Sequence, residues 1–97
     1  MDQLEVTYET MKQWDLSKTH YTLIDIREEE ERKQEHIGGD WIPLSELLSR
    51  LNEIPSGSII LYCRSGGRSL MATKKLRDVL SRDDIYSLHG GILGYPK

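Results

Sequence analysis

Short apolar runs alternate with amphipathic stretches along the whole of this 97-residue chain. The strongest run, residues 58–63 (SIILYC), is almost continuously apolar, which is typical of a strand buried on both faces of a parallel sheet. Residues 21–26 (YTLIDI) form a second run of this kind. Strands that alternate with helices predict parallel βα units with right-handed crossovers, and therefore the α/β class. Shorter extended pieces are expected at 4–6, around 41–42 and at 84–88.

The most highly charged stretch, residues 28–35, is predicted to form a helix. Its acidic residues come first and its basic residues later, which suits the helix dipole. Four-residue spacing allows the pairs Glu28–Arg32 and Glu29–Lys33. We interpret this charge run as a solvated helix face.

The other predicted helices carry apolar side chains at helical spacing. Thr7 is suited to cap a helix that begins at residue 8, and two more helices are predicted at 44–51 and 68–80. The apolar positions are Leu44, Leu47, Leu48 and Leu51 in the first of these two, and Ala72, Leu76, Val79 and Leu80 in the second.

Length and charge limit the kind of protein that this sequence encodes. Ninety-seven residues predict one domain, 1–97. A net charge of −3 argues against a partner such as nucleic acid. No apolar stretch approaches the ~20 residues of a membrane helix, and the first residues do not resemble a secretory signal. We therefore expect a cytoplasmic monomer with no membrane partner.

Cys63, the only cysteine, ends the stronger strand and precedes a glycine-containing loop that leads into a helix. In open α/β sheets, ligands bind beyond the carboxyl ends of strands, where helices begin. Gly66 and Gly67 allow the backbone N–H groups to turn inward as an anion-binding nest. Arg64 and Arg68 add two cations, so we expect a thiol pKa well below the ordinary value of about 8.5 and a nucleophilic Cys63 thiolate. The alternative is that Cys63 is a small buried apolar residue.

Three further polar residues belong near this loop. Asp25 and Arg27 follow the other strong strand, so they are expected at the same sheet edge as Cys63. They would orient the loop through an Asp25–Arg68 pair or an Arg27–carboxylate pair, or else form an ordinary turn. Ser69 is suited either to hydrogen-bond the sulfur or to cap the helix.

The loop CRSGGRS (63–69) resembles the active-site loop of single-domain rhodaneses. Three other segments are similar to rhodanese segments and occur in the same order: LIDIREEEE (23–31), EHIGGDWIP (35–43) and LHGGILGY (88–95). The resemblance implies a sheet of about five parallel strands flanked by helices. It also implies transfer of sulfane sulfur from thiosulfate or a persulfide, with Cys63 as the catalytic residue. We expect no cofactor, and no metal either, because the chain has one cysteine and its histidines His20 and His89 have no ligand-like neighbours. The expected substrate-binding residues are Arg64, Ser65, Gly66, Gly67, Arg68 and Ser69.

Three functional hypotheses are consistent with this loop. The first is a thiosulfate sulfurtransferase in which Cys63 forms a persulfide and passes the sulfur to cyanide or a thiol. The second is a persulfide carrier that serves one partner protein. The third is a cysteine-dependent phosphatase, but such loops read C-x5-R, whereas four residues separate Cys63 from Arg68 here. Since a shorter loop is a narrower bowl, it fits a terminal sulfur better than a phosphoryl group.

Overall fold

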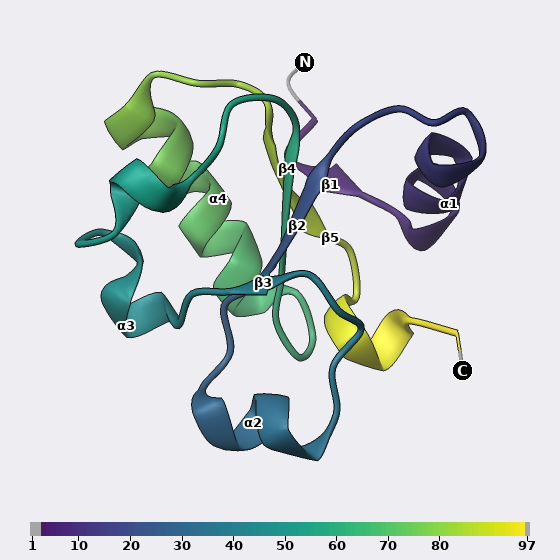
Figure 1. Ribbon diagram of the computed structural model, residues 1–97, viewed down its shortest axis with the longest axis horizontal. Coiled ribbons are helices and arrows are strands. Elements are labelled where there is room, and N and C mark those ends of the chain that lie inside the picture. Colours follow the sequence, from purple (N-terminus) through teal and green to yellow (C-terminus); the bar gives the residue numbers. More distant parts are fainter. Residues whose placement is uncertain (1–2, 97) are drawn as a thin grey trace.

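A computed structural model describes residues 3–96 of the chain, which form one parallel sheet with helices on both faces (Figure 1). All strand pairs are parallel, and the strand order is β1-β5-β4-β2-β3. The fold therefore confirms the predicted α/β class and five-stranded parallel sheet. The predicted domain, 1–97, includes residues 1, 2 and 97, which lie outside the described residues. The strands are β1 (Glu5–Val6), β2 (Thr22–Asp25), β3 (Asp40–Trp41), β4 (Ile59–Tyr62) and β5 (Ile85–Leu88).

Helices cover both faces of the sheet. Figure 1 shows α1 on one side and α3 and α4 on the other, with α2 beyond the end of the strands. Thr7 caps α1 as predicted, because its side chain accepts a hydrogen bond from the Thr10 backbone. The α-helices are α1 (Tyr8–Leu16), α2 (Glu29–Gln34), α3 (Leu44–Leu47) and α4 (Gly67–Leu80), and two 3₁₀ turns are η1 (Leu51–Glu53) and η2 (Gly91–Gly94).

Alternate side chains of the central strands fill two cores. Ile59 and Leu61 of β4 pack with Leu76 on the side of α3 and α4, whereas Ile60 and Tyr62 pack on the side of α1. All four residues of β4 are fully buried, as a nearly continuous apolar run predicts for a central parallel strand.

The leucine-rich helix predicted at 44–51 is the main error in the predicted elements. The structure divides this stretch into α3 and η1. Leu47 is buried there, but Leu44 and Leu48 are exposed, so the four leucines do not form one buried face. The predicted core face of α4 holds for Ala72 and Leu76, whereas Val79 is exposed. Both errors have one cause: the spacing of apolar residues along a helix cannot show which of them other elements will cover.

Candidate active site

The candidate site lies where the chain leaves β2 and β4, which are neighbours in the sheet. From β2 the chain continues to β3 on one side, and from β4 it continues to β5 on the other. The two exit loops therefore diverge, which creates a crevice at the carboxyl ends of the strands. The loop that follows β4 begins with Cys63, and the segment that follows β2 contains Arg27 and leads into α2.

Glycine conformations shape the loop around Cys63. Gly66 is the N-cap of α4 and has a left-handed backbone (φ 104°), which residues with side chains rarely adopt. The other side of the loop is held by η2, because Ile92 N–H donates to the Cys63 carbonyl and Leu93 N–H donates to the Arg64 carbonyl. The closing glycine segment of the sequence thus acts as a support for the cysteine loop.

The Cys63 sulfur sits inside a ring of hydrogen-bond donors. The backbone N–H groups of Gly66 and Ser69 donate to Sγ over 3.1 and 3.4 Å, and the Ser69 hydroxyl lies 3.4 Å from Sγ. Burial raises the pKa of the Cys63 thiol, but hydrogen bonds from the Ser69 side chain and from the backbone of Ser69, Gly66 and Ser65 outweigh it and lower the pKa. The residue as a whole is only 1% exposed.

Ser69 therefore contacts the sulfur and does not cap the helix, since Gly66 occupies the cap position. The Ser69 hydroxyl also meets the hydroxyl of Ser87, at 2.6 Å. Sequence reasoning missed Ser87, which is fully buried on β5. A signal was present: Ser87 lies two residues after the core residue Ile85, so a hydroxyl occupies an inward-facing strand position. Buried hydroxyls need hydrogen-bond partners, which makes such a position worth inspecting.

The two arginines of the loop are placed very differently. The guanidinium of Arg68 forms two hydrogen bonds with the carboxylate of Glu31, at 2.9 and 2.8 Å. The predicted Asp25–Arg68 pair is therefore wrong. The Arg64 side chain is exposed, and its guanidinium makes no hydrogen bond or ion pair with any residue in 3–96. The hydrogen bonds around Sγ, more than two adjacent cations, thus account for the lowered thiol pKa.

Glu31 is the second residue that sequence reasoning missed, because the charges of α2 were interpreted as a solvated face. Hydrogen bonding from Arg68 lowers the pKa of Glu31 to about 2, against a smaller opposing effect of burial, so its carboxylate is ionised at neutral pH. The predicted Glu29–Lys33 pair is present at 3.4 Å. Arg32, however, pairs with the buried Asp25 at the end of β2 and not with Glu28.

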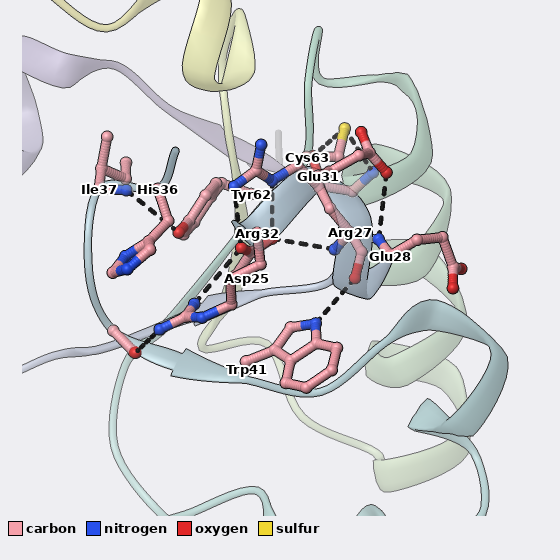
Figure 2. Close-up of polar contacts among 12 residues, drawn as sticks. Asp25, Arg27, Glu28, Glu31, Arg32, His36, Ile37, Trp41, Tyr62 and Cys63 are labelled. Atoms are coloured by element: carbon pink, nitrogen blue, oxygen red, sulfur yellow. Dashed lines mark hydrogen bonds and ion pairs between the residues drawn. The ribbon is translucent and has the colours of Figure 1, made fainter. Parts of the chain in front are cut away.

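Asp25 and Arg27 form a second buried cluster of the site (Figure 2). The guanidinium of Arg27 donates to both carboxylate oxygens of Asp25, at 2.9 and 3.0 Å, which confirms the predicted Arg27–carboxylate pair. Figure 2 shows Asp25 between Arg27 and Arg32. The Arg32 guanidinium lies 3.3 Å from a carboxylate oxygen of Asp25. The Trp41 indole donates to the Arg27 carbonyl at 2.8 Å. This network fixes the chain between β2 and α2, and thereby the position of Glu31.

A polar cavity of about 260 Å³ opens beside the cysteine loop. Carboxylate, guanidinium and apolar side chains line it together, and the two arginines present are Arg27 and Arg64. Because Arg27 is bound to Asp25, the unpaired guanidinium that lines this space belongs to Arg64. Within residues 3–96, no cluster of His, Cys, Asp and Glu side chains is arranged to hold a metal ion. No helix of that part is both long and apolar enough to cross a membrane.

Comparison with known proteins identifies the family to which this parallel-sheet fold belongs. The chain belongs to the rhodanese-like domain family, whose profile matches residues 7–97. A Bacillus subtilis (strain 168) protein named "Putative sulfur carrier protein YrkF" is 37% identical over 75 residues, covering 75% of this chain and 40% of that protein.

Solved structures agree on the fold. The crystal structure of reduced Bacillus anthracis CoADR-RHD has 31% sequence identity and a TM-score of 0.76, and the match covers 92% of this chain and 16% of that one. A Staphylococcus saprophyticus crystal structure has 21% identity and a TM-score of 0.84, covering 99% and 94% of the two chains. The chain thus spans less than half of the B. subtilis relative and about a sixth of the B. anthracis protein.

Proposed function

We propose that this protein is a sulfurtransferase in which Cys63 carries sulfane sulfur as a persulfide. The observation that carries the proposal is the set of groups around Sγ: the Gly66 and Ser69 N–H groups donate to it, and the Ser69 hydroxyl lies within hydrogen-bond range of it. Such donors stabilise a thiolate before the reaction and a terminal sulfur anion after it, as an oxyanion hole does. Membership of the rhodanese-like family and the sulfur-carrier name of the B. subtilis relative support sulfur transfer as the reaction class.

In the first half-reaction, the Cys63 thiolate attacks the outer sulfur of the donor. A sulfur–sulfur bond forms at Sγ while the bond inside the donor breaks, and the leaving group departs with that electron pair. Thiosulfate releases sulfite, and a persulfide donor releases a thiolate. Arg64 is the exposed cation best placed to attract an anionic donor, because it lines the cavity beside the loop. The lowered thiol pKa favours the thiolate that this attack requires.

In the second half-reaction, an acceptor takes the outer sulfur and Cys63 leaves as a thiolate. The acceptor is cyanide in an assay and a thiol in a cell. Since the sequence contains no second cysteine, the persulfide cannot be resolved within the chain, and the acceptor must come from outside.

A carrier that hands sulfur to one partner protein is the second candidate, and the name of the B. subtilis relative favours it. The two candidates share the first half-reaction and differ in the second. An enzyme turns over with small thiols, whereas a carrier keeps its persulfide until the partner is present. The lifetime of the Cys63 persulfide in the presence of excess small thiol distinguishes the enzyme from the carrier.

The test is the intact mass of the protein after separate incubations with thiosulfate, cysteine persulfide and an aryl phosphate. We expect one added sulfur atom with at least one sulfur donor, none in the Cys63→Ala variant, and no hydrolysis of the phosphate. An unmodified mass with both sulfur donors refutes sulfur transfer. Rapid aryl phosphate hydrolysis that depends on Cys63 assigns the loop to phosphoryl chemistry.

A further inference from the structure

The carboxylate of Glu31 binds the guanidinium of Arg68, the second arginine of the cysteine loop. Both of its oxygens bind the Arg68 guanidinium, and Oε1 also accepts from the backbone N–H of Glu28, at 3.1 Å. That last contact belongs to a reciprocal capping box at the start of α2. The carboxylate is therefore fixed by a helix terminus as well as by its ion pair, and it is only partly exposed.

The other arginines near this cavity also bind acceptors within the protein, with one exception among the described residues. Arg27 is bound to Asp25 and to the Glu35 carbonyl, and Arg32 is bound to Asp25 and to the Gly39 carbonyl. Among residues 3–96 that line the cavity, Arg64 is the arginine without such a partner.

Acidic side chains face the same space. The cavity that Arg64 lines is also lined by Glu31 and Glu35. A dianion that approaches Cys63 thus meets one uncommitted guanidinium and a fixed ionised carboxylate. Because like charges repel, each additional negative charge on a donor is disfavoured beside the Glu31 carboxylate.

We propose that Glu31 is a specificity-determining residue that disfavours dianionic sulfur donors such as thiosulfate and favours donors with a single negative charge or none, as in organic persulfides. The inference rests on the proposed function and names its donor class. Glu31 acts in two ways: its charge repels a second anionic group on the donor, and its hydrogen bonds keep Arg68 from binding that group.

A matched pair of donors isolates this effect. Thiosulfate and the methanethiosulfonate anion both present a terminal sulfur on a tetrahedral sulfur atom, but a methyl group replaces one charged oxygen in the second. Attack by Cys63 forms the same Cys63 persulfide in both cases; thiosulfate releases sulfite and methanethiosulfonate releases methanesulfinate. The ratio of their second-order loading rates therefore reports donor charge, while any change in the thiol pKa cancels from it.

The experiment measures loading of Cys63 by rapid quenching and intact mass. In Glu31→Gln we expect the thiosulfate-to-methanethiosulfonate rate ratio to rise about tenfold, which corresponds to ~1.4 kcal/mol. Glutamine still satisfies the third position of a capping box, so the helix start is retained. Glu31→Asp keeps the negative charge, so its rate ratio should stay below that of Glu31→Gln. An aspartate that reaches Arg68 should hold the ratio within about twofold of wild type.

Glu30→Gln is the matched control, because Glu30 lies next to Glu31 on α2, is exposed, and has the same formal charge. Its ratio should stay within about twofold of wild type, since exposed charges are screened. An unchanged ratio in Glu31→Gln, or an equal rise in Glu30→Gln, overturns the assignment while the proposed function stands. Failure of the wild-type protein to load from either donor or from 2-hydroxyethyl persulfide overturns both.

Discussion

The hydroxyl oxygens of Ser69 and Ser87 lie 2.6 Å apart, behind the sulfur of Cys63. Ser69 has one hydroxyl proton and three neighbours within hydrogen-bond range: the Cys63 sulfur, the Gly66 carbonyl and Ser87. If Ser69 donates to a thiolate, Ser87 must be the donor in the serine pair. Ser87 thus supports the orientation of Ser69 in which its proton faces the sulfur.

Replacing Ser87 with alanine should raise the pKa of the Cys63 thiol, because the Ser69 proton is then free to turn to the Gly66 carbonyl. Alkylation by iodoacetamide near neutral pH should slow about threefold to tenfold, since a hydrogen bond contributes ~1 kcal/mol. Ser69→Ala should raise the thiol pKa as well, and the double variant should react no more slowly than Ser69→Ala. The pH dependence of alkylation measures the effect.

Thr73→Val is the control for the serine variants. Thr73 is a fully buried residue of α4 whose hydroxyl has no hydrogen-bond partner among the described residues. Its replacement removes a buried hydroxyl from the same helix without touching the sulfur. A slower alkylation rate in Thr73→Val equal to that in Ser87→Ala would show that the effect comes from packing and not from the serine pair.

The Glu31–Arg68 bridge should make stability depend on pH in the acid range. The folded pKa of Glu31 is about 2, below its ordinary value of 4.5, so the bridge stabilises the protein above pH 4.5 and loses this contribution as the pH falls toward 2. At pH 6 the free energy of unfolding of the wild-type protein should exceed that of Glu31→Gln by about 1 kcal/mol or less, because the ion pair is partly exposed. Urea unfolding at pH 6 and pH 3 tests this, and an equal difference at both pH values contradicts it.

Gly91→Ala should displace the cysteine loop. Gly91 has a positive φ (57°), and a Cβ atom there would lie 2.5 Å from the carbonyl oxygens of Cys63 and Arg64. We expect a loss of about 3 kcal/mol in the free energy of unfolding and a slower loading of Cys63. Gly38→Ala provides the comparison, since Gly38 also has a positive φ but no atom within 4 Å of the added Cβ, and should cost ~1 kcal/mol. Equal losses in the two variants would rule out the close approach as the cause.

Asp25→Asn should be strongly destabilising. Asp25 is fully buried and neutralises the buried Arg27, so its loss leaves a guanidinium charge without a counterion. We expect a loss of about 3–5 kcal/mol in chemical unfolding. Glu29→Gln, which removes an exposed charge paired with Lys33, should cost about 0.5 kcal/mol or less. A cost for Asp25→Asn as small as that of Glu29→Gln would mean that the buried pair has little structural role.

The cysteine loop could be predicted because its features are local in sequence. Cys63 ends an apolar strand, and the glycines and the helix that follow it lie within a few residues, so their geometry depends little on the rest of the chain. The predicted parallel sheet is confirmed for the same reason: residues 21–26 and 58–63 are apolar enough to require burial on both faces.

The contacts that complete the site join residues far apart in the sequence. Glu31 and Arg68 are separated by 37 positions, and Ser69 and Ser87 by 18. Nothing in the charge run of α2 distinguishes Glu31 from its exposed neighbours until the sheet brings α2 beside the start of α4. The leucines of 44–51 show the same limit, because burial depends on which surface covers a helix.

The α/β alternation, the central strands and a cysteine at the entrance to a helix follow from short segments of sequence, because strand burial and backbone freedom at glycine are local properties. The pairing of charges depends instead on the folded chain. Arg68 is bound to Glu31 and Arg64 is left exposed because strand order sets which helix terminus lies next to the cysteine loop. Electrostatic interactions depend on distance in space, and that distance is fixed only when the sheet has formed.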